Sequence, residues 1–255
     1  MIISSSFRKF LTVCAVALFW LLVWEGVAAW VGATIILVPP RMAFARLFTL
    51  AQTLEFWLAI FTSLRRIMLG FALAMFTGIF LATGAAASKI FRHIILPAIN
   101  VLNAMPLASF VILVLFMFGR ENLSIVVPFV MVMPIAFHNV YKGITTTDPA
   151  LLEMAHVFRV PLWKRIRYIY LHSVRPFIFS AATIGIGFAW KSGISAELIG
   201  VARGTIGGYL HRAQISIQPI DMYAWTIAII TLSYAIDKCF YLMLGRGIKN
   251  DAHNL

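Results

Sequence analysis

Three of the six histidines and one glycine-rich stretch are the first candidates for catalysis, metal binding or phosphate binding in this chain. His138, His156 and His172 share no spacing typical of metal ligands, and the sequence has no HExxH, no GxSxG and no clustered pair of carboxylates. The stretch GVARGTIGGYL, residues 200–210, has the glycines of a phosphate-binding loop but lacks its GK[ST], and no predicted strand leads into it. We therefore expect no catalytic site, no ATP site, no metal site and no cofactor.

The composition places the chain among polytopic membrane proteins. Its 255 residues are 62% hydrophobic and 12% charged, whereas soluble domains carry roughly 25% charged and about 45–50% apolar residues. The net charge of +12 is typical of cytoplasmic loops on an anionic inner leaflet, and no basic run is interleaved with exposed aromatics, so we expect no nucleic-acid partner. Cys14 and Cys239 lie inside apolar runs and predict neither a disulfide nor a metal framework.

Apolar runs of roughly 18–25 residues can cross a bilayer as helices, and the sequence predicts about six of them. They cover residues 10–31, 67–87, 106–118, 123–141, 177–194 and 222–244. The third run is short unless it starts near Leu96, since Pro97 and Pro106 interrupt it. Near its end the first run contains VAA (27–29), which mimics a signal-peptide cleavage site, but the run is long for a signal peptide and more spans follow. We therefore predict an uncleaved first helix and an all-α polytopic membrane protein.

Lysine and arginine residues predict the orientation of these spans, because cytoplasmic loops carry more of them than outer loops. With both termini inside, the loop between the fourth and fifth spans is cytoplasmic. Arg65 and Arg66 then fall toward the outer side, and Glu25 is expected either to pair with a basic residue such as Arg66 or to reach the interface. Residues 200–210 are expected to form a re-entrant or outer loop whose backbone needs burial in protein.

The cytoplasmic loop, residues 148–178, is longer than a connection between two spans requires and has the pattern of two short helices. Asp148 suits an N-cap and Pro149 suits the first helical position. Residues at helical spacing then predict an apolar face on the first helix. These residues are Leu151, Leu152, Ala155 and Phe158. Pro161 disfavours helical geometry at Val160, so it ends this helix.

The second predicted helix of the loop, LWKRIRYIYLHSV, is amphipathic and strongly basic, and Pro176 is expected to start the next span after it. Its apolar side carries Trp163 and Ile166, while Lys164 and Arg165 face another side. Such a helix can lie on anionic lipid. The first helix lacks lysine and arginine, so lipid attraction does not explain it, and a protein partner is the alternative.

Lys191 and Glu197 are ionisable residues at the end of the fifth apolar run, six residues apart. Ionisable groups at membrane depth are costly and usually face a transport route or a partner group. The pair therefore has two interpretations. Either Lys191 and Glu197 line a translocation pathway or its outer gate, or they form a helix-end pair in which Lys191 reaches the interface.

The segment EMA (153–155), followed by a turn and an apolar-basic helix, resembles the EAA loop of binding-protein-dependent ABC importer permeases. The second motif position is methionine instead of alanine, the usual turn glycine falls on Arg159 and a common proline falls on His172. A non-glycine residue in a left-handed conformation costs about 1 kcal/mol or more. We therefore expect this turn to be built differently, with Pro161.

Other segments add to this resemblance, which covers about residues 24–244. SLRRIMLGFALAMFTGIFLA (63–82) and LPAINVLNAMPLASFVILVLFMFG (96–119) are similar to the permease core of that superfamily. WKSGISAELIGVARGTIGGYL (190–210) is similar to the nitrate, sulfonate and taurine subfamily.

The resemblance implies a type I ABC importer permease (MetI-like) fold, forming one transmembrane domain over residues 1–255 with a core at about 60–245 and a coupling loop at about 145–175. It implies three kinds of partner: a cytoplasmic ABC ATPase dimer, an extracytoplasmic solute-binding protein and a second permease copy. One such loop per chain fits a permease homodimer. The chain would lie in the cytoplasmic (inner) membrane of a prokaryote, with both termini cytoplasmic, and it would not be an enzyme, because ATP hydrolysis belongs to the ATPase.

In that family the coupling loop docks into a groove on each ATPase, and the resemblance implies matching roles here. The residues are Glu153 as the central docking residue, Met154 beside it, Ala155 for close approach, and Phe158, Arg159 and Trp163 in the flanking contact. The subfamily implies a small solute, either an anion of the nitrate, sulfonate or taurine kind or a vitamin precursor. Lys191 would suit an anion, whereas Glu197 nearby weakens that case.

Two other classes of membrane protein are alternatives. A gradient-driven secondary transporter or channel would favour carboxylates in the spans and paired inverted repeats. The spans hold few acidic residues and the sequence has no convincing internal repeat. An integral membrane enzyme would show a cluster of polar catalytic residues near one interface, and none is evident.

Overall fold

The computed structural model describes the backbone of residues 5–251 and the side chains of residues 11–242, and in this part every regular element is a helix. The helices are α1 (Ser5–Val31), α2 (Pro40–Ala51), α3 (Leu54–Ala87), α4 (Lys89–Ala104), α5 (Leu107–Phe118), α6 (Leu123–Thr145), α7 (Pro149–Val157), α8 (Leu162–Arg165), α9 (Leu171–Gly200), α10 (Ile206–Ile215) and α11 (Pro219–Asp251). A 3-10 turn, η1 (Arg120–Asn122), precedes α6, and a π-helical turn, η2 (Ile166–Tyr170), joins α8 to α9.

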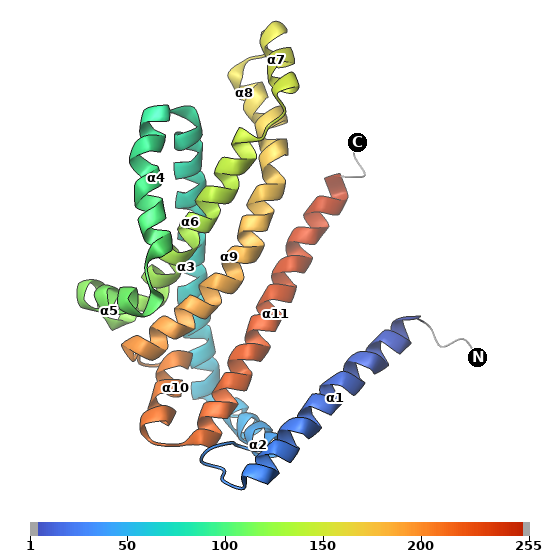
Figure 1. The fold of residues 1–255 in the computed structure, drawn as a ribbon, viewed down its shortest axis with the longest axis vertical. Helices are drawn as coiled ribbons and strands as arrows, with labels where there is room; N and C mark the ends of the chain where they lie inside the picture. The colour runs from blue at the N-terminus through green and yellow to red at the C-terminus, as the bar shows by residue number, and fades with distance from the viewer. Residues whose placement is uncertain (1–4, 252–255) are drawn as a thin grey trace.

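Helices α3, α6 and α9 form the centre of the bundle (Figure 1). At one end the α7–α8 turn extends beyond α3 and α4, and α2 and α10 lie at the opposite end (Figure 1). Helix α1 lies apart from the centre and contacts α2 (Figure 1). The segment with α7 and α8 therefore projects at one end of the molecule, and the other end is built from several short elements.

Five stretches of the described chain are long and apolar enough to cross a membrane. They are Leu11–Val31, Leu54–Ala87, Arg120–Thr145, Leu162–Gly200 and Pro219–Leu242. Helices α4 and α5 make a sixth crossing if they count as one broken span, with a bend of 108° between them. This confirms the prediction of an all-helical protein with about six spans.

The structure corrects three predicted boundaries. The third span is not a straight helix over 106–118, because Pro106 lacks an N–H and the chain turns sharply there into α5. The second span begins at Leu54 instead of residue 67, since Thr53 caps α3 by accepting a hydrogen bond from the Phe56 N–H. Pro176 does not start a span but lies inside α9, because an internal proline removes one backbone hydrogen bond and bends a helix without always ending it.

Small residues let the central helices approach closely. A Cβ atom added at Gly70 of α3 would lie 2.3 Å from the main-chain oxygen of Ile125 in α6, and one at Gly78 would lie 2.5 Å from the Ala136 Cβ. Close backbone approach through small residues is a main source of helix association in lipid. The α3–α6 pair is thus a rigid frame that positions the remaining elements.

Candidate functional site

The α7–α8 turn exposes an unusual amount of apolar surface. Phe158 is 75% exposed and Trp163 is 68% exposed, and Met154, Val157 and Leu162 beside them are exposed as well. The turn extends beyond the ends of α3 and α4, so this surface lies at one end of the bundle and not along the sides of its long helices (Figure 1). Exposed apolar patches of this kind mark interaction sites.

The six residues that were predicted to dock lie together in the α7–α8 segment. Five of them are exposed and one is buried. Glu153 lies on the surface with Met154, Phe158, Arg159 and Trp163. Ala155 is buried inside the turn, so its small side chain makes room within the loop itself. The predicted docking contact of these residues stays a prediction, with Ala155 placed behind the surface.

The start of α7 is built as the sequence predicts. The Asp148 carboxylate accepts a hydrogen bond from the Ala150 N–H at 2.9 Å, and Pro149 occupies the first helical position. One of the free N–H groups at the helix start is therefore satisfied by a local side chain.

The end of α7 differs from the prediction, because Arg159 does adopt the left-handed conformation, with φ of +48°. The Val160 N–H donates to the Ala155 carbonyl at 2.9 Å, and the Arg159 N–H donates to the His156 carbonyl at 3.0 Å. This pair of hydrogen bonds is the Schellman helix end, which glycine usually completes. The turn therefore keeps the usual backbone with arginine in the glycine position, and Pro161 only precedes α8.

Arg165 fixes α8 against the end of α7. Its guanidinium donates from Nε to the Val160 carbonyl at 2.8 Å and from Nη2 to the Ala155 carbonyl at 3.0 Å. The helical pattern predicted only that Arg165 belongs to a basic face, because a sequence does not show which carbonyls a turn brings near it. Hydrogen bonds from a charged donor are stronger than neutral ones, so Arg165 holds the shape of the turn.

Glu197 lies at the other end of the central bundle, fully buried among four helices. Its carboxylate accepts hydrogen bonds from the hydroxyls of Ser63 in α3 at 2.9 Å and Ser124 in α6 at 2.8 Å, and from the Gly207 N–H of α10 at 3.1 Å. Ser63 also accepts from the Ile206 N–H at 3.0 Å. Glu197 thus ties α9 to α3, α6 and the start of α10.

Comparison with known proteins decides the class. Residues 74–246 match the family described as binding-protein-dependent transport system inner membrane component. The chain belongs to this family. It is therefore the inner membrane permease component of a binding-protein-dependent ABC transporter, a non-catalytic subunit, and such a system implies an ATPase and a solute-binding protein as partners. The family sets aside the gradient-driven transporter and the membrane enzyme.

Individual relatives are distant. The permease is 24% identical over 215 residues to the taurine transport system permease protein TauC of Escherichia coli (strain K12). The aligned region covers 80% of this chain and 78% of TauC. It is 29% identical over 154 residues to the nitrate import permease protein NrtB of Synechococcus elongatus, covering 60% and 55%. The crystal structure of an amino acid ABC transporter with histidines matches with a TM-score of 0.61 at 16% identity, covering 75% of this chain and 92% of that one. This last likeness shows that the permease has the fold of an ABC transporter subunit.

Lys191 and Glu197 do not form a pair in the permease. Lys191 is exposed and lines a groove between α9 and α11, together with Ser195 of its own helix and Asp237 of α11. The groove suits the predicted pathway for Lys191, whereas the Glu197 carboxylate is enclosed by its hydrogen-bond donors. The assignment of both residues to a pathway stays a prediction.

Two other ion pairs connect α2 to α1 and to α11. Glu25 pairs with a basic residue, as one of the two expectations had it, but this residue is Arg41, at 3.1 Å, and not Arg66, because Arg41 at the start of α2 follows α1 closely in the fold. Arg46 of α2 makes two hydrogen bonds to Asp221 of α11, at 2.5 and 3.0 Å. The hydrogen bond and charge of Asp221 raise the pKa of Arg46 above its ordinary value.

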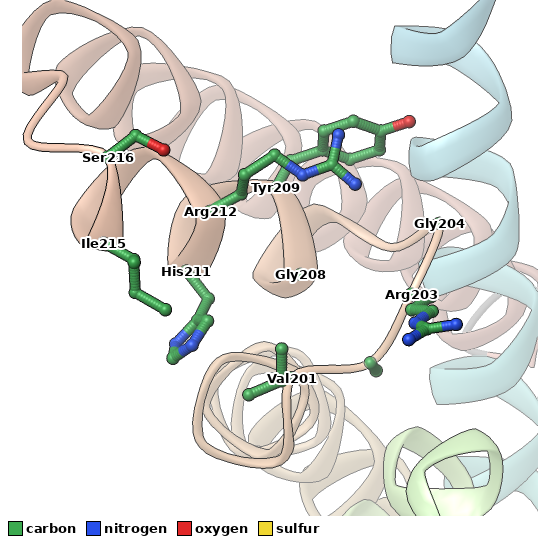
Figure 2. A pocket seen from close by; sticks show the side chains of 10 residues that line it. Val201, Arg203, Gly204, Gly208, Tyr209, His211, Arg212, Ile215 and Ser216 are labelled. Atoms are coloured by element: carbon green, nitrogen blue, oxygen red, sulfur yellow. The ribbon is translucent and has the colours of Figure 1, made fainter.

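The glycine-rich stretch of the permease is helical at its end, as α10, and only its first part is a loop. Thr205 caps α10 by accepting a hydrogen bond from the Gly208 N–H at 3.2 Å. A small pocket of about 220 Å³ lies between this loop and α10, with His211 and Val201 close to its mouth and Arg212 alongside Tyr209 (Figure 2). The backbone burial that was expected for this stretch is supplied in part by Glu197, which accepts from Gly207.

Proposed function

We propose that the permease imports a small oxyanion-bearing solute, of the nitrate or taurine kind, and that the α7–α8 turn docks on the partner ATPase to couple import to ATP hydrolysis. The observation that carries the coupling role is the exposed apolar surface of this turn, with Glu153 beside Phe158 and Trp163. Apolar anchors surrounded by charged residues are the usual composition of a protein interface. The charged residues here are Arg159 and Lys164.

The helix that follows the turn supports transmission of movement. Residues Leu162–Gly200 form one continuous stretch of 39 residues, so a displacement of the docking turn would move the far end of α9. That far end carries Glu197, which is bonded to α3, α6 and α10. We propose rigid-body rocking of this kind between two permease copies, in a homodimer that binds an ATPase dimer.

The orientation follows from the same surface. An ATPase lies in the cytoplasm, so the α7–α8 end is proposed to be cytoplasmic, and the α2–α10 end faces the solute-binding protein. Both termini are then cytoplasmic, as the distribution of basic residues predicts. One transmembrane domain over residues 1–255 remains part of this proposal.

The substrate class rests on the relatives. The names of two of them specify taurine and nitrate, and both solutes are small and carry an oxyanion group. This favours an oxyanion over a vitamin precursor. Uptake of labelled taurine and labelled nitrate by cells that express the permease with its own ATPase and binding protein tests this choice, and uptake of neither would overturn it.

Co-purification tests the docking role. Affinity-tagged permease is extracted in detergent with the ATPase encoded nearest to it, as wild type, Glu153→Arg and Glu55→Arg. Glu55 is an exposed acid in the first turn of α3, which follows α2, and Figure 1 shows α2 at the end opposite the α7–α8 turn, so the reversal of this charge is the matched control. We expect ATPase with the wild type and the control and none with Glu153→Arg. Normal recovery of ATPase and normal transport by Glu153→Arg would contradict the proposal.

A further inference from the structure

An open pocket of about 630 Å³ lies where α3 faces η1 and the start of α6. Its polar lining comes from Arg65 and Arg66 of α3 and from Glu121 and Asn122 of η1. Both arginines belong to the candidate membrane span Leu54–Ala87. This stretch is 34 residues long and about 20 residues cross a bilayer, so its first part, which holds both arginines, can lie at the edge of the hydrocarbon region.

Arg66 is only partly satisfied by the protein. Its side chain is 16% exposed and forms an ion pair with Glu121 through Nη2. Its Nη1 is buried and has no hydrogen-bond partner among the described residues. A buried donor without an acceptor is unfavourable, and the donor lies in a group that lines the pocket. Nη1 is covered in this conformation, so an acceptor from outside the chain reaches it only when the Arg66 side chain turns toward the pocket.

The charge around the pocket is positive. Arg65 is exposed beside Arg66, whereas Glu121 is the only acidic residue in the lining and already faces Arg66. Glu121 is 62% exposed, so it is free to move or to meet a second group. Asn122 donates from Nδ2 to the Phe118 carbonyl at 3.0 Å, which fixes the turn that carries both η1 side chains.

The wall of the pocket is held rigidly. Ile125 belongs to the lining, and its main-chain oxygen packs directly on Gly70, where a Cβ atom would come within 2.3 Å. The two arginines therefore stand on a helix that cannot shift easily against α6. A site held in place before a ligand arrives loses less free energy on binding.

We infer that this Arg65–Arg66 pocket binds the oxyanion group of the transported solute, as a station on its route through the permease. The inference rests on the proposed import of an oxyanion-bearing solute. A guanidinium presents planar donors that match two oxygens of a sulfonate or a nitrate, and Nη1 of Arg66 is the donor that lacks an acceptor. For a zwitterion such as taurine, Glu121 takes the ammonium group; for nitrate, it stays with Arg66.

Direct binding to the isolated permease in lipid nanodiscs tests the pocket. The probes are radiolabelled taurine and labelled nitrate, at an ionic strength kept constant with chloride. The variants are Arg65→Gln, Arg66→Lys and Arg120→Gln. Arg120 is the matched control, because it is an exposed arginine of η1 that does not line the pocket.

We expect both probes to bind wild type and Arg120→Gln alike. Arg66→Lys keeps the charge but loses the planar donors, and Arg65→Gln removes an exposed charge, so each is expected to weaken binding about tenfold or more. Glu121→Gln is expected to weaken taurine more than nitrate, which separates the role of the carboxylate from that of the arginines.

The inference is overturned if neither probe binds wild type, or if Arg65→Gln and Arg66→Lys bind as wild type does. Loss of binding in Arg120→Gln to the same degree would also overturn it, since this result indicates a general effect of charge. Co-purification of the ATPase is measured on the same variants and is expected to be unchanged. Uptake of the same two probes by cells that express the wild-type system separates the two proposals: uptake without binding at this pocket overturns only the pocket, whereas uptake of neither probe overturns the proposed import.

Discussion

Arg165 donates a hydrogen bond from Nη2 to the main-chain oxygen of Ala155 at 3.0 Å, across the turn between α7 and α8. The same Ala155 oxygen also accepts a hydrogen bond from the Val160 N–H, so it is bonded both to the Arg165 side chain and to the backbone of the turn. The shape that the exposed residues present to a partner thus depends on a residue behind them.

Replacement of Arg165 by alanine should loosen the turn without unfolding the permease. The Ala155 and Val160 carbonyls lose a charged donor, which costs about 1.5–3 kcal/mol if no water replaces it. We expect faster proteolysis within residues 149–165 and weaker recovery of the ATPase. Lys164→Ala, at an exposed neighbour that belongs to the proposed docking surface, is the control for proteolysis only and should leave the rate of proteolysis unchanged. Equal effects of the two variants on proteolysis would contradict the anchoring role.

Arg159→Gly should stabilise the turn, because Arg159 holds a left-handed backbone conformation that glycine adopts freely. The relief is about 1 kcal/mol, reduced by the greater flexibility of glycine in the unfolded chain. Arg159→Ala keeps the strain and removes the same side chain. A thermal unfolding midpoint higher for glycine than for alanine checks this prediction, and equal midpoints would show that the turn is not strained. If the side chain contacts the ATPase, both variants lose affinity to a similar degree.

Local signals in the sequence predicted the local parts of this structure. Asp148 and Pro149 gave the start of α7, and the apolar runs gave the number of spans, because capping and hydropathy depend on neighbouring residues. The start of α3 was misplaced because the charges of Arg65 and Arg66 indicated the end of a span. The structure places both within the helix, where they line a pocket with η1.

The hydrogen-bond partners of Glu197 could not be predicted from neighbouring residues in the sequence. Ser63 lies 134 residues from Glu197 in the sequence, and Ser124 lies 73 residues from it. A serine in an apolar helix is compatible with many environments, so nothing in the sequence marks these two as donors to one carboxylate. The prediction that Glu197 has a special role came from its cost at membrane depth, and only the fold shows what compensates that cost.

Glu197→Ala should destabilise the permease strongly. The substitution leaves the Ser63 and Ser124 hydroxyls and the Gly207 N–H without their acceptor in a buried site, at a cost of about 3 kcal/mol or more in total. We expect a lower melting temperature in detergent and a lower yield. Glu197→Gln, which keeps the shape and one acceptor oxygen, should recover part of the loss. Lys191→Ala, on the exposed side of α9, is the control and should melt as wild type does.

Gly70→Ala should disrupt the contact between α3 and α6. The added Cβ atom would lie 2.3 Å from the Ile125 carbonyl oxygen, a distance that forces backbone movement, since no flexible side chain can yield there. Overpacking of this kind costs about 1–3 kcal/mol. Gly26→Ala in α1 is the matched control, because nothing lies within 4 Å of the position its Cβ would take. Thermal unfolding in detergent should show a lower midpoint for Gly70→Ala and little change for Gly26→Ala.

Since Ile125 also lines the Arg65–Arg66 pocket, Gly70→Ala should weaken oxyanion binding too. Unchanged binding would show that the pocket does not depend on the close contact between α3 and α6.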